Sequence, residues 1–533
     1  MFSCNNYDII IIGGGISGLF IADKLINTNL DVLLIEGSTE LGGRVHTIKK
    51  DNVSYECGAA RFHDNHTKLI SLLHDLKLED KIMTLPSDSE HILRGYKRDY
   101  NYKTKNKLNL SKLLKEAYEK RDTFEHNDLI NITFFQYLTF IFDHETATFI
   151  QHSFGYDAEF IYLNASAALE MFQSDFFSKG DYYVLNGGLS QIIKKLENEI
   201  NKCHHITILK NTTVKDINHN YIITNNDTYY FTNLVCAIPQ KALQQFSYFN
   251  TVNALNSVKA IPLLRIYAKY STKDLWFKGI KRTKTDNYLR QIIPISEKDG
   301  LIMISYTDCE YAEMWSKCHT NGDEFLIKMI HKEIKKLYGI EPSKPEFIAV
   351  HYWDEGVHMW KTGYDMKHNY QKILKPFEHQ DIFICGEAFS TKQGWIEGAL
   401  STCYNVIKSL PLLKSRELTI KTSNETKDIS SDKEKIEFKE YTIQQVLQES
   451  DWIIIEVEGV KNIYDISEWI PKHPGGSIIY DGIKANEHYL DSKKYKQSPT
   501  EIFMSISAHK HSNIYKKFFI QKNEDVILVG FLK

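Results

Sequence analysis

The chain has 533 residues, which is too many for a single hydrophobic core and predicts more than one domain. Charged residues make up 25% of it and nearly cancel, to a formal net charge of -3, so the sequence offers no electrostatic basis for binding nucleic acid. No apolar run approaches the roughly 20 residues of a membrane-spanning helix, so we expect no membrane insertion.

The first predicted unit is a strand, a tight turn and a helix. A β-branched run over residues 8–12 enters Gly13, Gly15 and Gly18, and residues 19–25 have helical composition and spacing. The first glycine permits the turn, the second lets the backbone approach a pyrophosphate, and the third lets the helix pack closely on the strand. The amino end of the helix then faces the diphosphate.

A second predicted strand, over residues 32–35, delivers Glu36 where a carboxylate can accept hydrogen bonds from both hydroxyls of an adenosine ribose. A glycine-rich turn alone would be weak support, because such turns often serve only to pack a strand against a helix. With both strands, the helix and the acidic residue in place, the sequence predicts a dinucleotide cofactor.

The segment after this acidic residue resembles flavin-dependent amine oxidases. Gly42, Gly43 and Arg44 are similar to the GGR motif of that family, whose arginine reaches the diphosphate and flavin side. The resemblance covers roughly residues 5–410, and it implies FAD as the cofactor instead of NAD.

The next segment contains small residues, at Gly58 and Ala59, that would let the backbone lie against a planar ring. In the family, this segment runs under the flavin. Arg61 comes directly after it, and in amino-acid oxidases of the family an arginine at this offset binds the substrate carboxylate bidentately. The alternative for Arg61 is pairing with a local acid or with the flavin diphosphate.

Two blocks are predicted to form the substrate domain. Residues 81–180 are aromatic and helical in composition, and the run 134–142 is predicted to be a buried helix. Residues 246–349 include 263–270, which alternates like a half-buried strand. Many family members carry a lysine at the position of Arg265, where it holds a water next to the reactive flavin nitrogen, so the arginine leaves the oxygen chemistry open.

The nucleotide fold is predicted to resume between these blocks, with a helix that begins near residue 187 and strands at 206–209 and 214–217. In relatives, the valine that matches Val214 lends its backbone to the adenine.

A final FAD segment is predicted near residue 385. Gly386 and Glu387 are similar to the family pair that contacts the ribityl chain, and residues 394–399, GWIEGA, resemble the motif that places a helix amino end under the flavin pyrimidine. The resemblance makes Trp395 one wall of an aromatic pair around the amine. We expect Trp360 as the opposite wall, with Tyr364 in reserve and core packing as the alternative for each aromatic.

No cysteine stands in this loop, where some relatives attach the flavin, so we expect FAD to be bound non-covalently. The resemblance and the motifs together yield two sets of candidate residues. The cofactor-binding set is Gly13, Gly15, Ser17, Gly18, Glu36, Gly43, Arg44, Gly58, Ala59, Arg61, Val214, Gly386, Glu387, Trp395 and Ile396, and the catalytic set is Trp395, Trp360, Arg61 and Arg265.

Residues 413–437 have the composition of a charged linker, and residues 438–533 resemble a cytochrome b5 domain. The resemblance rests on a predicted strand at 460–465 and on the HPGG motif that begins at His473. It implies haem b, with iron held by His473 and by His511, or by His509 as the alternative. Two histidine ligands leave no open coordination site, so such a haem passes electrons.

Eight cysteines without a CxxC pair predict neither a zinc site nor a disulfide scaffold. A strand predicted within ten residues of Met1 leaves no room for a signal peptide, so we expect a cytoplasmic protein.

The sequence therefore predicts a Rossmann-like α/β FAD-binding fold, an interleaved α+β substrate domain and a small C-terminal α+β haem-binding domain. The first two would share residues 1–412, with FAD-binding parts at 1–80, 181–245 and 350–412. The expected activity is oxidation of an amine or amino acid by hydride transfer to FAD, with electrons passed to the fused haem or to O2. Two alternatives remain: an enzyme that oxidises a carbon–carbon bond, as desaturases and porphyrinogen oxidases of this superfamily do, or a flavin–haem electron carrier without a substrate of its own.

Overall fold

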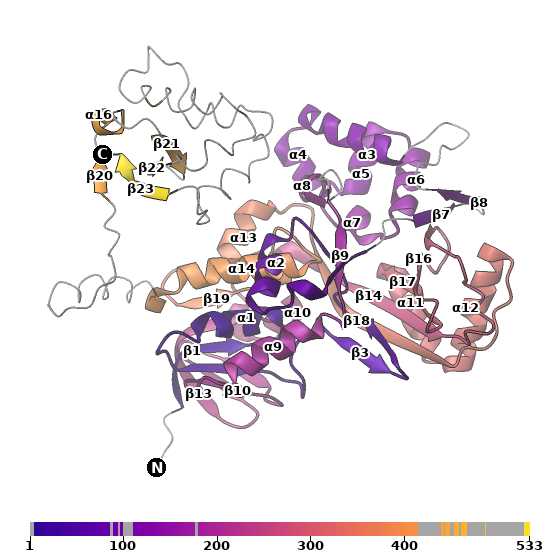
Figure 1. Cartoon of the computed structure of the whole chain (residues 1–533), viewed down its shortest axis with the longest axis horizontal. Coiled ribbons are helices and arrows are strands. Elements are labelled where there is room, and N and C mark those ends of the chain that lie inside the picture. Colours follow the sequence, from indigo (N-terminus) through magenta and orange to yellow (C-terminus); the bar gives the residue numbers. More distant parts are fainter. Residues whose placement is uncertain are drawn as a thin grey trace. The chain divides into compact units, whose positions relative to one another are not determined.

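The computed structural model (Figure 1) forms two compact units, residues 1–425 and 426–533. The residues that it describes are 5–85, 89–93, 96–99, 110–175, 180–413, 439–441, 443–447, 452–457, 460–465, 486 and 527–532. In this part of the chain no helix is both long enough and apolar enough to cross a membrane. The seven cysteines within it are free thiols.

A seven-stranded sheet carries the predicted nucleotide fold of the first unit. Its strand order is β10-β2-β1-β13-β12-β11, and β19 pairs with β13. The pairs among β10, β2, β1, β13 and β19 are parallel, and β11, β12 and β13 are joined as antiparallel neighbours. The strands are β1 Asn6–Ile12, β2 Val32–Ile35, β10 Ile206–Leu209, β11 Val214–Ile217, β12 Tyr221–Thr224, β13 Thr228–Cys236 and β19 Ile382–Ile384.

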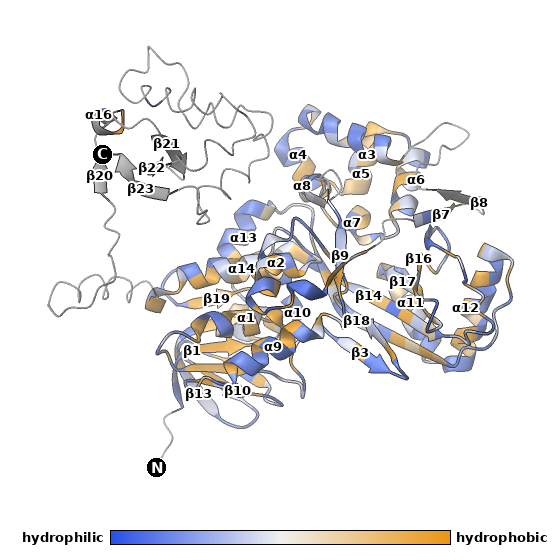
Figure 2. Cartoon of the chain, viewed as in Figure 1, coloured by the Kyte–Doolittle hydropathy of each residue, from blue (hydrophilic) through white to orange (hydrophobic). Residues whose placement is uncertain are grey.

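Both faces of this sheet are covered, as expected for a parallel sheet with near-continuous apolar strands. Ile9 and Ile11 of β1 pack with the helices α1, α2, α9 and α14, whereas Ile10 and Ile12 belong to the core on the other face. Figure 2 shows the sheet as a hydrophobic layer beneath these helices. The helices are α1 Ile16–Leu25, α2 Thr67–Asp75, α9 Ser190–Ile200 and α14 Ile396–Ser409.

The predicted substrate domain contains a second seven-stranded sheet, ordered β18-β14-β17-β16-β15-β7-β8. The alternating burial predicted for residues 263–270 is wrong: Leu264, Ile266 and Tyr267 are all buried, because β14 lies between β17 and β18 and has a core on each face. The strands are β7 Ser89–Leu93, β8 Tyr96–Asp99, β14 Val258–Lys269, β15 Arg282–Thr285, β16 Gln291–Ser296, β17 Leu301–Asp308 and β18 Phe347–Trp360, and helices α11 Cys309–His319 and α12 Asp323–Tyr338 pack on it.

A group of short helices completes the substrate domain (Figure 1). The helix predicted at 134–142 is present as α5, but it is buried on one face only, since Phe134 and Tyr137 are in the core and Phe140 is 69% exposed. The group comprises α3 Leu110–Glu119, α4 His126–Asn131, α5 Phe134–Ile141, α6 His144–Phe154, α7 Ala158–Ile161 and α8 Ala165–Asp175.

Smaller elements join the two parts of the first unit. They are the hairpin of β3 Thr47–Lys50 and β4 Val53–Glu56, the three-stranded sheet of β5 Phe62–His63, β9 Tyr182–Leu185 and β6 Ile82–Thr84, and the helices α10 Gln240–Gln244 and α13 Met366–Leu374.

The described residues of the second unit include a four-stranded sheet ordered β20-β23-β22-β21. The strand predicted at 460–465 is present as β22, which pairs with β21 and β23. His473, His509 and His511 lie outside the described residues. The elements are β20 Lys439–Tyr441, α16 Ile443–Val446, β21 Trp452–Val457, β22 Val460–Asp465 and β23 Ile527–Leu532.

Candidate active site

The glycine-rich turn has the shape that the motif predicts. The Gly13 N–H donates to the Ile35 carbonyl at 2.8 Å, and a β-carbon on Gly18 would lie 1.9 Å from the Gly13 oxygen, so the close approach of α1 to β1 requires glycine there. No side chain caps the amino end of α1 at Gly15. Its first-turn N–H groups are therefore available to a diphosphate.

Glu36 lies at the end of β2 beside this turn. Its carboxylate accepts hydrogen bonds from the Gly14 N–H at 2.8 Å and from the Ser38 N–H and hydroxyl at 2.8 and 2.7 Å. These bonds fix the carboxylate at the turn. Thr212, two residues before Val214, donates its N–H to the Glu36 carbonyl, so the chain passes beside Glu36 just before it reaches Val214.

Open space next to these glycines provides a test of whether FAD fits. A β-carbon on Gly15 would meet no atom of the described chain within 4 Å, and one on Gly386 would meet only the Ser17 hydroxyl, at 4.0 Å. A β-carbon on Gly43 would face the Gly15 α-carbon at 3.7 Å. Gly43 thus lies against Gly15 and Gly386 lies near Ser17 of the same turn, with little protein around the uncapped helix terminus, and this arrangement fits a dinucleotide.

An ion pair joins the first and last FAD motifs. Arg44 Nη1 lies 2.7 Å from Glu387 Oε2 and donates to the Gly356 carbonyl at 3.1 Å. The same carboxylate accepts the N–H groups of Gly394 at 2.8 Å and His358 at 3.1 Å. Burial favours the neutral acid, but Arg44 and His358 outweigh it and hold the pKa of Glu387 well below its usual range.

His358 extends this network and had no sequence signal, because nothing local marks its partners. Its ring lies between two carboxylates, with Nδ1 3.0 Å from Glu387 Oε2 and Nε2 3.4 Å from Glu355 Oε2. Burial lowers the pKa of His358, and the Glu387 and Glu355 carboxylates raise it further than burial lowers it. The position between two carboxylates therefore favours the protonated imidazole, in which both ring nitrogens donate.

The segment predicted to run under the flavin packs on Arg44. The Ala59 N–H donates to the Arg44 carbonyl at 2.8 Å, and a β-carbon on Gly58 would lie 1.9 Å from that oxygen. Arg265 and Trp353 hold the preceding residues, donating to the carbonyls of Glu56 and Cys57 at 2.9 and 2.7 Å.

Arg265 is thus buried and bonded to backbone, and its guanidinium lies 4.4 Å from the centre of the Tyr306 ring. This geometry gives it a positioning role for the segment under the predicted flavin.

Trp395 lies at the amino end of α14, which has no side-chain cap. Its ring is 6.2 Å from that of Tyr182, with planes 24° apart, and 4.8 Å from the His66 ring at an edge-on angle. The Arg61 guanidinium carbon lies 5.1 Å from the Tyr182 ring centre and 5.9 Å from that of Trp395. The structure therefore brings Arg61 and Trp395 together and adds Tyr182, which the sequence did not indicate.

Trp360 does not fit the role of the opposite wall. It is 1% exposed, its indole N–H donates to the Ser390 carbonyl at 2.9 Å, and it packs in the main core. Trp360 is the last residue of β18 and pairs with Val258 of β14, which belongs to the same core, so it takes the core-packing alternative expected for it.

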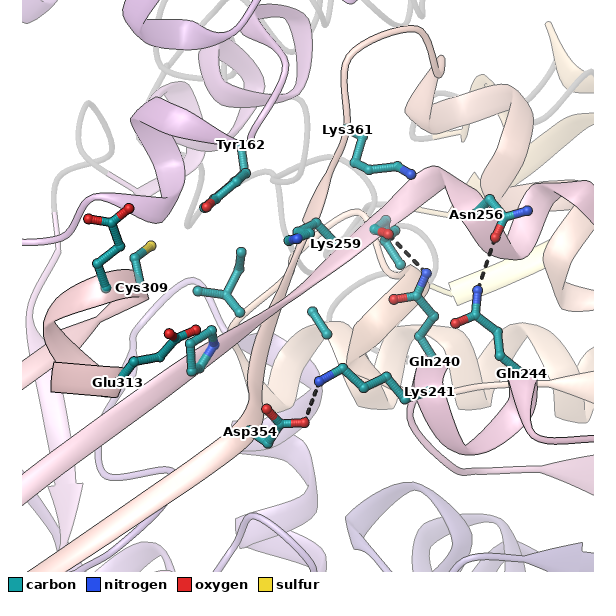
Figure 3. Close-up of a pocket in the computed structure, with 15 residues that line it drawn as sticks. Tyr162, Gln240, Lys241, Gln244, Asn256, Lys259, Cys309, Glu313, Asp354 and Lys361 are labelled. Carbon is teal, nitrogen blue, oxygen red and sulfur yellow. Dashed lines mark hydrogen bonds and ion pairs between the residues drawn. The ribbon is translucent and has the colours of Figure 1, made fainter. Parts of the chain in front are cut away.

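A separate pocket of about 360 Å³ in the first unit contains none of the predicted site residues (Figure 3). Two pairs of its polar side chains bond to each other: Gln244 donates to Asn256 at 3.0 Å, and Lys241 pairs with Asp354. Gln240 donates to the backbone carbonyl of Leu255 at 2.7 Å. This pocket is not the candidate active site.

Comparison with known proteins decides the family. The model of the flavin-containing amine oxidoreductases matches residues 16–406. The chain belongs to this family. It is therefore an FAD-dependent oxidoreductase, and its first unit has the amine oxidase FAD-binding fold.

The relatives differ in how much of the chain they match. Achacin from Lissachatina fulica is 24% identical over 492 residues, which are 75% of this chain and 92% of achacin. Amine oxidase A from Canis lupus familiaris is 36% identical over 74 residues, 14% of each chain.

Solved structures share the fold. A cofactor-binding variant of putrescine oxidase matches with a TM-score of 0.63 and 17% identity, covering 76% of this chain and 99% of its own. A structure assigned as a protoporphyrinogen oxidase from Exiguobacterium sp. matches with a TM-score of 0.60 and 15% identity, covering 77% and 99%.

Proposed function

We propose that the chain is an amine oxidase whose substrate is an α-amino acid or a related amine. The observation that carries this proposal is the position of Arg61, whose guanidinium lies over Tyr182 and Trp395 at the amino end of α14. A planar guanidinium binds a carboxylate through two parallel hydrogen bonds, and the two aromatic rings confine the carbon next to it.

The residues divide the work between holding the cofactor and placing the substrate. Gly15, Ser17 and Glu36 would hold the diphosphate and ribose, and Arg44 and Glu387 would fix the two segments on either side of the flavin. FAD, when bound, supplies a hydride acceptor for the carbon that bears the amine. If the amine binds in its neutral form, no side chain has to act as a base. The main contribution of the protein side chains to catalysis is then the positioning of the substrate by Arg61.

The electron acceptor we propose is O2 or the C-terminal unit. Support for the latter is the sequence from His473, HPGG, which comes after the strand β22 as in a cytochrome b5 domain. We propose that this unit binds haem b through His473 and His511, with His509 as the alternative. His473→Ala should then abolish the haem absorbance of the purified chain and leave its flavin content unchanged. A wild-type chain without haem after expression with a haem supply would refute this.

Anaerobic mixing with a panel of amino acids, putrescine and protoporphyrinogen IX tests the proposed substrate class through loss of flavin absorbance. We expect amino acids to reduce the flavin. Oxidation of a carbon–carbon bond is the second candidate, favoured by the fold shared with the structure assigned as a protoporphyrinogen oxidase. Reduction by the porphyrinogen and by no amine would replace the first proposal with the second. No reduction by any compound would favour an electron carrier.

Substitution of Arg61 tests the same proposal at the residue. Arg61→Lys keeps the positive charge and loses the planar fork, so catalytic efficiency should fall about tenfold or more for amino acids and should change little for putrescine. The measurement is the rate of flavin reduction for each substrate. Equal losses for both classes would return Arg61 to a structural role.

A further inference from the structure

Two further cations stand on one face of strand β15. Residues alternate across a strand, so Arg282 and Lys284 share a face, while Thr283 and Thr285 point to the opposite face. Both threonines are fully buried, and the Thr283 hydroxyl bonds to Glu90 at 3.1 Å. The buried face of β15 is therefore satisfied, and the two cations project to the other side.

Arg282, Lys284 and Arg61, here called the cation cluster, interact with one another. Burial and the charge of Arg61 lower the pKa of Arg282 to about 10. Burial, Arg282 and Arg61 lower the pKa of Lys284 to about 7. Arg61 and Arg282 also both act on the hydroxyl of Tyr156, whose pKa burial raises. The cluster is thus a local group of like charges on half-buried side chains.

No carboxylate in the described part of the chain forms an ion pair with the cluster. Arg282 donates one hydrogen bond, to Gln291 at 3.0 Å, and its Nε is buried without a partner. Lys284 lies 5.6 Å from the centre of the Phe154 ring. Holding several half-buried cations close together without counter-ions costs free energy, so this arrangement favours the arrival of an anion.

The nearest acid does not supply that counter-charge. Glu159 interacts with Arg61 and Lys284, but burial and the carboxylates of Asp308 and Asp157 raise its pKa to about 8, so it is largely protonated at neutral pH. Asp157 itself is paired with Arg290 at 2.9 Å. Arg282, whose pKa stays near 10, remains charged at neutral pH, and Lys284, whose pKa is about 7, gains its full charge when an anion binds beside it.

We propose that Arg282 and Lys284 form a side-chain subsite that selects an α-amino acid whose side chain carries a carboxylate. This inference rests on the proposed function, in which Arg61 receives the α-carboxylate. One dicarboxylate would then supply an anion at each end of the cluster, and the aromatic walls at Trp395 and Tyr182 would lie beside the Arg61 end. An apolar side chain would leave the buried Nε of Arg282 unpaired, and an amide would pair it without supplying the negative charge that the cations favour.

Paired substrates and variants of the FAD-loaded full chain test the subsite. L-Glutamate and L-glutamine have the same shape and differ in side-chain charge, so wild-type kcat/KM for flavin reduction should favour glutamate at least about tenfold. In Arg282→Gln and in Lys284→Met this ratio should fall toward one. Lys278→Gln, at an exposed position before β15, is the matched control and should keep the wild-type ratio. Flavin content and melting temperature verify that each variant folds.

A binding measurement separates the subsite from the chemistry. Glutarate carries both carboxylates and no amine, whereas butyrate carries one, so glutarate should raise the melting temperature more, and Arg282→Gln should remove the difference. If glutarate binds in this way and no amino acid reduces the flavin, the proposed function fails and the dianion subsite stands. If L-glutamine or L-lysine reduces the flavin as fast as L-glutamate, or if glutarate and butyrate bind alike, the inference is overturned.

Discussion

At the scale of single residues, the Glu387 carboxylate holds together the chain segments that carry the FAD motifs. It accepts bonds from Gly394 and His358 and pairs with Arg44, which lies 343 positions earlier in the sequence. With the His358 ring nitrogen Nδ1, four groups from three segments therefore converge on one buried acid. A buried charge of this kind is costly to strip of its partners, since the remaining groups lose compensation.

Glu387→Gln should lower the free energy of unfolding by about 3 kcal/mol or more, because the charges of Arg44 and His358 remain without their shared acid. The pH dependence has a definite sign. The folded-state pKa of Glu387 lies below the ordinary value of 4.5, so its stabilisation is complete above that pH and is lost as the pH falls further.

The free energy of unfolding is measured by urea titration from neutral pH down to pH 3. Below pH 4.5 it should fall more steeply for the wild type than for the variant. Glu341→Gln removes an exposed ion pair with Lys335 and is the control, expected to change stability little. Parallel acid curves for the wild type and Glu387→Gln would contradict the assigned role.

At the scale of elements, local pattern predicted much of the nucleotide fold. The strands at 32–35, 206–209 and 214–217 have the predicted bounds, because short apolar runs between turn residues specify buried strands locally. Contacts between residues far apart in the sequence could not be predicted from local pattern. Trp360 has the composition of a pocket wall and lies in the core, and Tyr182 gained its place beside Trp395 only through the assembly of β9.

The candidate site shows the same contrast between residues with a local sequence pattern and residues that meet only in the fold. The glycines and Glu36 carry a spacing that encodes their geometry, so they were identifiable. His358 and Glu355 carry no such spacing and meet Glu387 only in the folded chain. Tertiary contacts of single polar residues are therefore the part of the site that sequence reasoning missed.

The loop that contains Gly58 provides a test at this scale. Gly58→Ala places a β-carbon 1.9 Å from the Arg44 carbonyl oxygen, so the loop must move away from Arg44 and the bond from the Ala59 N–H is lost. We expect a weaker hold on FAD with the far-ultraviolet dichroism unchanged. Gly37→Ala is the control, since its β-carbon would meet only the Thr213 hydroxyl, at 3.7 Å. Equal flavin content in wild type and Gly58→Ala would refute the close packing.

At the scale of the whole molecule, the non-covalent state of FAD is the property to check. The cysteines of the first unit that lie near the FAD motifs are buried, and Cys403 Sγ donates to the Ser17 carbonyl at 3.5 Å. Burial also raises the pKa of Cys57 to about 11, which disfavours a reactive thiolate. Acid precipitation should release all the flavin into the supernatant, measured by fluorescence. Flavin that remains with the washed precipitate would show a covalent link.

The pairing of β13 with β19 has a consequence for folding during translation. The last residues of β13, 234–236, pair with residues 382–384, which are synthesised about 150 residues later. Until then the nascent chain carries an open strand edge next to its completed glycine-rich turn. Open edges recruit foreign strands, so translation pauses between these two strands would lengthen a window for aggregation. Holdase chaperones bound during that interval would protect the chain while the C-terminal segment of its cofactor site, from Gly386 onward, has not yet been synthesised.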